Sequence, residues 1–86
     1  SNQLYQNSPN PFSISTDIVF ELADAGNVQL EIYSTTGQRV YFVEKEYKAG
    51  KHQITINGQA FKESGIYYYH LKSAYYNSTR KMIFTK

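Results

Sequence analysis

Residues 15–22 read STDIVFEL, and this stretch decides the fold because its apolar and polar side chains alternate. In an extended chain, successive side chains point to opposite faces. One face of this stretch carries Thr16, Ile18, Phe20 and Leu22, and the other carries Asp17, Val19 and Glu21. This period of two predicts a strand that is buried on one face and exposed on the other.

The same alternation returns downstream at intervals that suit short strands. Branched and aromatic residues, which favour pleated sheet, are concentrated in residues 28–33, 39–47, 52–57, 66–73 and 79–86. Turn-forming residues separate these runs, and no helical period of 3.6 lasts beyond one turn. The sequence therefore predicts an all-β fold, an immunoglobulin-like antiparallel β-sandwich of six strands, or seven if residues 4–6 pair at an edge.

Turn residues specify some of the connections further. ADAGN at 23–27 predicts a hairpin that pairs residues 15–22 with residues 28–33. In STTGQ, which follows, Gly37 is expected to adopt a positive φ. The next run, residues 39–47, becomes more charged toward its end, which is typical of an edge strand.

Length and composition limit the class of protein. A chain of 86 residues predicts one domain, in which residues 4–86 form the sandwich and residues 1–3 are left over from a linker or an expression vector. Without cysteine, the chain has neither disulfides nor thiolate metal sites. Its formal charge of +2 is spread along the chain and no long apolar run is present, so we expect neither nucleic-acid binding nor membrane insertion.

Paired carboxylates that could act as an acid and a base are poorly placed. Asp17 and Glu21 lie about 13 Å apart along one strand face, beyond the roughly 5–9.5 Å between the two carboxylates of glycosidases. Glu44 and Glu46 are about 6.6 Å apart, but lysines surround them and no apolar pocket is apparent that would raise either pKa. We expect no catalytic residues and no enzymatic activity.

Other chemical signatures are also missing. His52 and His70 could meet as two metal ligands, but a third ligand at a recognisable spacing is absent. The sequence contains no glycine-rich phosphate loop and no nucleophile elbow. We therefore expect no metal and no cofactor.

The nine tyrosines raise the alternative of an aromatic platform for sugar rings. Alternation places Tyr67, Tyr69 and Leu71 on one face of their strand, and we expect this face in the core with the hydroxyl groups at its margin. Tyr75 and Tyr76 remain as candidates for an exposed platform. On that alternative, the chain is an accessory carbohydrate-binding or adhesive module.

The N-terminal segment SPNPF, residues 8–12, is stiff because each proline fixes φ near −65° and keeps the preceding residue extended. Two interpretations are open. The segment is a stiff junction between a flexible linker and the sandwich, anchored by Phe12, or it covers a sheet edge and blocks strand pairing there, and the two are compatible.

A family resemblance covers the chain from Leu4 to Lys86. LYQNSPNPF resembles the opening of the type A C-terminal sorting domain carried by cargo of the type IX secretion system of Bacteroidetes. The later segments TDIVFEL, GNVQLEIYSTTGQRV, YKAGKHQITING, SGIYYYHL and TRKMIFTK follow in the order of that family and at nearly its spacing. The ordered set is much more specific than any one segment.

The resemblance implies a set of recognition residues. The family's signatures fall on Pro9, Asn10, Pro11 and Phe12, on Gly65, Ile66 and Tyr67, and on the basic residues Lys81 and Lys86. From the position of the last segment, TRKMIFTK, we expect a terminal strand that a receptor reads through main-chain pairing and charge.

The resemblance also implies a function and partners. The domain is expected to direct a parent cargo protein, N-terminal to it, through the periplasm and across the outer membrane, to the cell surface or the medium. The implied partners are the outer-membrane translocon, a periplasmic shuttle and a sortase-like peptidase that removes the domain. The domain itself then acts as a ligand and substrate.

Overall fold

The computed structural model describes residues 1–86 and consists of strands joined by short connections, with one 3₁₀ helix. The elements are β1 (Gln3–Leu4), β2 (Ser15–Leu22), β3 (Gly26–Ser34), β4 (Arg39–Tyr47), β5 (Gly50–Asn57), the helix η1 (Gly58–Ala60), β6 (Gly65–Lys72) and β7 (Asn77–Phe84). The predicted all-β class is confirmed, and a seventh, N-terminal strand pairs at an edge, although it spans residues 3–4 and not the expected 4–6. Gln3, expected in the linker, belongs to β1, and the Asn2 side chain accepts a hydrogen bond from the Ala23 amide.

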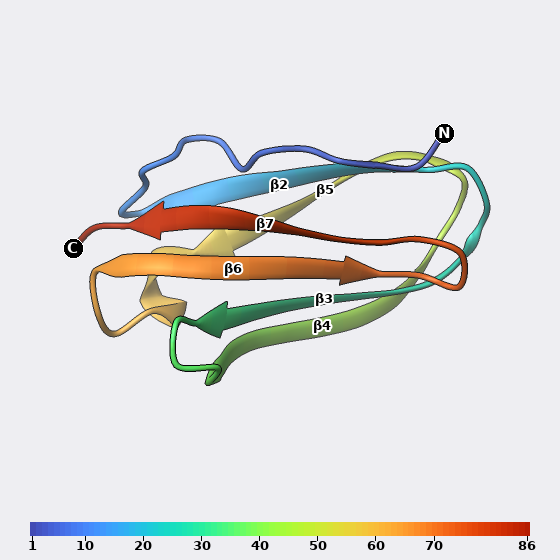
Figure 1. The fold of residues 1–86 in the computed structure, drawn as a ribbon. Coiled ribbons are helices and arrows are strands. Elements are labelled where there is room, and N and C mark those ends of the chain that lie inside the picture. The colour runs from blue at the N-terminus through green and yellow to red at the C-terminus, as the bar shows by residue number, and fades with distance from the viewer.

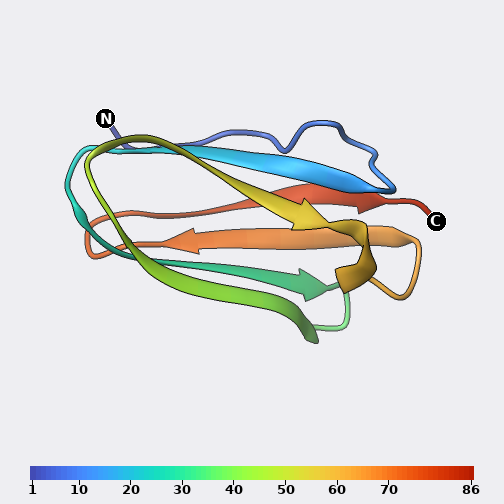
Figure 2. The ribbon, with the colours of Figure 1, turned by 180° about the vertical axis from the view of Figure 1, so that it is seen from behind.

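The strands form two antiparallel sheets that pack face to face (Figures 1 and 2). Sheet A has the order β1-β2-β5, and sheet B has the order β4-β3-β6-β7. The immunoglobulin-like sandwich predicted from the sequence is therefore confirmed. The N-terminus lies at one end of its long axis and the C-terminus at the other (Figure 1).

The predicted hairpin between residues 15–22 and 28–33 is wrong. β2 pairs with β1 and β5, whereas β3 pairs with β4 and β6, so residues 23–25 cross from one sheet to the other. Alternation predicts only that the apolar side chains of both strands face the core. Two neighbouring strands of one sheet and two strands in facing sheets both fulfil this prediction. The β3–β4 hairpin has its turn at residues 35–38, and Gly37 adopts a φ of 88° as expected.

The core lies between the sheets and contains the residues that alternation places inside. β2 is buried at every second residue from Thr16 to Leu22, and the same holds for Tyr67, Tyr69 and Leu71 on β6. Full burial of one such apolar side chain stabilises the fold by about 1.5–3 kcal/mol. The buried apolar set is Leu4, Phe12, Ile18, Phe20, Leu22, Val28, Leu30, Ile32, Ile56, Phe61, Tyr67, Tyr69, Leu71, Met82 and Phe84.

Candidate functional site: the N-terminal strap and the last strand

Residues 5–12, here called the N-terminal strap, run along the side of the sandwich beside β2 and reach the end of β7 at Phe12 (Figure 1). On the side of sheet A, the Tyr5 amide donates to the Val19 carbonyl at 3.0 Å. Ser8 and Asp17 exchange two backbone hydrogen bonds of 3.0 and 2.9 Å. The strap therefore continues the pairing that β1 begins. The Ser8–Pro9 and Asn10–Pro11 peptide bonds within it are both cis.

The strap then crosses to sheet B and occupies the outer edge of β7. The Phe12 amide donates to the Ile83 carbonyl at 3.1 Å, and the Phe12 carbonyl accepts from the Thr85 amide at 2.9 Å. The Asn10 side chain accepts from the Ile83 amide at 2.9 Å, and the Gln6 side chain donates to a β7 carbonyl at 2.7 Å. A receptor therefore cannot pair its main chain with this stretch of β7. These contacts agree with the interpretation that SPNPF covers a sheet edge.

A small polar centre is buried beneath the strap. The Tyr69 hydroxyl donates to the Tyr5 carbonyl at 2.8 Å and accepts from the Asn7 amide at 2.9 Å. The Asn7 side chain, with 3% of its surface exposed, donates to the Thr16 hydroxyl, which donates in turn to the Pro9 carbonyl. Burial raises the pKa of Tyr69 above its ordinary value of 10.0, although its hydrogen bond with Asn7 opposes this shift.

We expect replacement of Tyr69 by Phe to lower the free energy of unfolding by about 1–3 kcal/mol, since Asn7 and Tyr5 each lose a partner for a main-chain group. Because the pKa of Tyr69 is higher in the folded chain, its neutral form contributes stability below pH 10, and this contribution is lost as the pH rises from 10 through the raised pKa. Denaturant titrations on either side of pH 10 should show that wild type loses more stability than Tyr69→Phe. Equal losses would contradict this assignment.

Two of the predicted recognition residues lie in the core. Phe12 is 3% exposed, and its ring packs edge-on against Phe61 at 5.4 Å and at a tilt against Phe84 at 5.3 Å between centroids. Tyr67 is 5% exposed, contacts Phe61, and donates its hydroxyl hydrogen to the Glu63 carbonyl at 2.7 Å. Phe12 and Tyr67 hold the strap and the start of β6 in place from beneath the surface.

The other predicted recognition residues are at or near the surface. Ile66 is 41% exposed, and Lys81 and Lys86 are exposed, as are Pro9, Asn10 and Pro11. Gly65 is half-buried and has a φ of 149°. On the outer face of sheet B, Ile66 lies opposite Ile83 and Tyr68 lies opposite Lys81. We call this face, together with the adjoining turn of the strap, the β7 corner: Pro9, Asn10, Pro11, Ile66, Tyr68, Lys81 and Ile83.

Comparison with known families identifies the family and the function of this domain. The family model described as a secretion system C-terminal sorting domain matches residues 7–85. The chain belongs to this family. The family is the C-terminal sorting signal of type IX secretion, and the predicted function is confirmed. Among curated proteins, no match to the chain was found.

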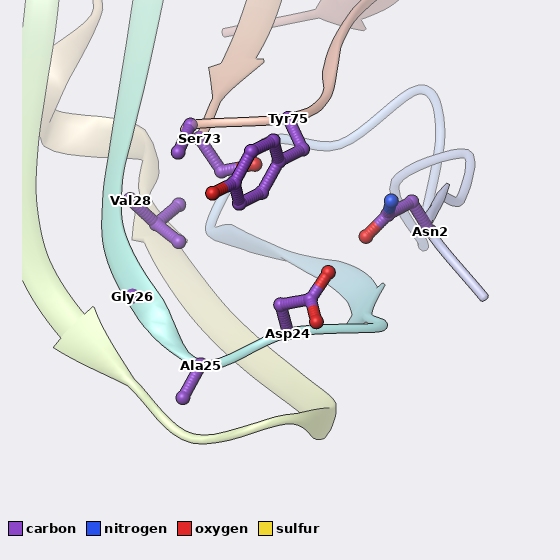
Figure 3. Close-up of a pocket in the computed structure, with 8 residues that line it drawn as sticks. Asn2, Asp24, Ala25, Gly26, Val28, Ser73 and Tyr75 are labelled. Carbon is purple, nitrogen blue, oxygen red and sulfur yellow. The ribbon is translucent and has the colours of Figure 1, made fainter.

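The surface of the sorting domain has three hollows. The hollow between Asn2, Asp24 and Tyr75 has a volume of about 20 Å³, which is room for roughly one water molecule (Figure 3). Two open hollows of about 230 and 290 Å³ lie beside the β6–β7 turn and beside the β3–β4 turn. Nowhere do three His, Asp or Glu side chains gather as they would around a metal ion. No helix of the sorting domain has the length and hydrophobicity that a membrane span requires.

The two histidines and the tyrosines of the sorting domain are dispersed. His52 packs at a tilt against the rings of Phe20 and Tyr47 where β4 and β5 meet, whereas His70, on the outer face of sheet B, contacts Thr79. Tyr75 is 82% exposed, while Tyr76 packs against the core. The side chains proposed for a flat sugar-binding platform therefore do not share one surface.

Sequence reasoning missed several residues that hold the strap of the sorting domain. Asn7 is buried at the polar centre, Gln6 binds β7, and Arg80 donates from β7 to the Leu4 carbonyl at 2.7 Å. A signal for Asn7 was present, because it is part of the LYQNSPNPF motif, but the predicted site residues began only at Pro9. Nothing in the local sequence marks Gln6 or Arg80.

Proposed function

We propose that the export machinery recognises the folded sorting domain through the β7 corner. The observation that carries this proposal is that the strap and β7, the two segments with the family's end signatures, are joined by backbone hydrogen bonds into one surface. Exposed apolar side chains of Ile66 and Tyr68 lie beside Lys81 on this surface. Such a combination of an apolar patch and a charge suits a protein interface.

On this proposal, the partners are the outer-membrane translocon, a periplasmic shuttle and a sortase-like peptidase. The domain passes through the periplasm with its parent cargo, and the peptidase removes it at the surface. The domain contributes recognition and no chemistry of its own.

The charge of Lys81 offers a test, because its side chain is exposed and has no ion-pair partner. We expect Lys81→Glu to lower the secreted fraction of a fused reporter on the order of tenfold, the effect of a 1.4 kcal/mol loss in binding. The matched control is Lys72→Glu, at the far end of the same sheet face opposite Asn77. Thermal unfolding of both variants should match wild type. Equal secretion of the two variants would count against the β7 corner.

A further inference from the structure

The two layers of the sandwich differ in width, which leaves one strand uncovered. On the side of the strap, β1 and β7 lie together, but sheet A has three strands and sheet B has four. On the opposite side, β5 turns away from β4 after the connection that they share (Figures 1 and 2). The inward-facing Tyr41 and Val43 of β4 are only half-buried, whereas their partners Ile32 and Leu30 on β3 are fully buried. One strand is missing opposite β4.

The neighbouring edge of sheet A, along β5, has free main-chain groups. The Gly58 amide donates to the Ile14 carbonyl, and Asp17 and Val19 direct their main-chain groups toward the strap. Because hydrogen-bonded pairs alternate along antiparallel strands, the even-numbered residues of β5 face β2. The N–H and C=O groups of Lys51, Gln53 and Thr55 therefore point away from the sheet.

This edge is the least protected of the sandwich. The strap covers β7, β1 has only two residues, and four charged side chains lie along β4. Proteins usually protect an edge strand by such devices, because an open edge pairs with other chains. β5 has eight residues, and after Lys51 it carries no Asp, Glu, Lys or Arg as far as Asn57. An edge strand of this length with one charged residue at its start is suited to accept another strand.

The surroundings of the edge define the chemistry of the occupant. A strand placed beside β5 would point every second side chain at Tyr41, Val43 and the half-buried Ile54, so these positions must be apolar. Lys45 lies in the same inward-facing row of β4, and Lys48 lies in the adjoining turn, and both are exposed. An acidic side chain at that end of the incoming strand would complement the two lysines.

We propose that the β5 edge accepts one extended strand of a protein of the export machinery, with alternating apolar residues and an acidic residue at the end near Lys45 and Lys48. The inference rests on the proposed function and adds a second contact surface, on the side of the sandwich opposite the β7 corner. A second copy of the domain fits poorly, because its own projecting β4 would enter the same space. Pairing of this kind takes its affinity from main-chain bonds and its specificity from alternate side chains.

A proline at residue 53 tests the proposal because it removes one free N–H of the edge and no hydrogen bond between β2 and β5. We expect Gln53→Pro to reduce secretion of a reporter fused to the whole chain at least about tenfold. Gln53→Thr keeps the N–H and should be secreted like wild type. If Gln53→Pro unfolds in thermal melts, Thr55→Pro replaces it, with Thr55→Val as the control for the hydroxyl that donates to Asp17.

Normal secretion of the folded proline variants, with wild type also secreted, overturns the edge proposal and leaves the proposed function intact. A second outcome also overturns the edge proposal: the wild-type domain is dimeric at micromolar concentration, Gln53→Pro is monomeric, and the variant is secreted normally. The β5 edge would then bind a second copy of the domain. Absence of secretion even for wild type would contradict the proposed function instead.

A binding experiment that does not depend on secretion further separates the edge proposal from the proposed function. The probe is a synthetic peptide of eight residues, the length of β5, with valine at every second position and glutamate at one end. Hydrogen exchange followed by NMR should show that the peptide slows exchange of the Gln53 and Thr55 amides about tenfold or more. It should leave Thr85, which is bonded to the strap, unchanged. No effect on the two β5 amides overturns the edge proposal whatever the outcome of secretion.

Discussion

Replacement of Phe12 by alanine should lower the free energy of unfolding by about 3–5 kcal/mol, the usual cost of removing a buried phenylalanine side chain. Phe12 is 3% exposed and packs against the rings of Phe61 and Phe84, which also stack on each other. A domain of this size has a total stability of roughly 4–13 kcal/mol, so the variant loses between about a quarter and all of it. At about 4–8 °C per kcal/mol, its Tm should fall by at least about 12 °C.

The effect of Phe12→Ala also reaches the strap, because the main chain of Phe12 holds Ile83 and Thr85. We expect faster amide exchange at Thr85 in the variant, together with lower secretion. Ile14→Ala is the matched control, since Ile14 is apolar, two residues away and 84% exposed. That substitution should change stability by less than about 0.5 kcal/mol. Similar Tm values for the two variants would show that Phe12 does not anchor the strap.

Gly58→Ala is the second substitution with a large expected effect. A Cβ atom at residue 58 would lie 2.0 Å from the Ser13 carbonyl oxygen and 3.0 Å from the Ile14 carbonyl oxygen. Both are backbone atoms, so no side-chain rotation relieves the overlap. The Gly58 amide also donates to Ile14 at 2.7 Å, and this bond must lengthen as the segments separate. We expect a loss of at least about 3 kcal/mol, the upper end of the range for overpacking.

Gly26→Ala provides the control for Gly58→Ala. A Cβ atom at Gly26 meets nothing within 4 Å, and the residue lies at the start of β3. Denaturant titration should place Gly26→Ala within about 0.5 kcal/mol of wild type. If Gly58→Ala were equally stable, the close approach between residues 13–14 and η1 would not exist in solution.

The strands of this domain were predictable because their pattern is local. The prediction that STDIVFEL forms one strand agrees with the bounds of β2, and RVYFVEKEY agrees with those of β4, since each residue's face depends only on its place in the alternation. Pairing was not predictable in the same way. The connection at residues 23–25 could end a hairpin or cross between sheets, and the side chains of β2 and β3 face the core in both cases.

The strap shows where sequence reasoning about the site stopped. Prolines at residues 9 and 11 predicted an extended segment, but they could not specify its partner. Its contacts join residues more than seventy positions apart, such as Asn10 with Ile83 and Gln6 with Lys81. Gly58 was likewise unmarked, because a glycine needed for a close approach looks the same in sequence as one in any turn.

The location of a fused reporter shows whether this folded domain directs export. Residues 1–86 are fused behind a fluorescent protein carrying an ordinary inner-membrane leader, in a host with type IX secretion. Fluorescence is then measured in the periplasm, on the cell surface and in the medium. We expect surface or medium fluorescence for the intact fusion and periplasmic fluorescence for the reporter alone and for Phe12→Ala. Equal export of the reporter with and without the domain would show that the domain does not direct export.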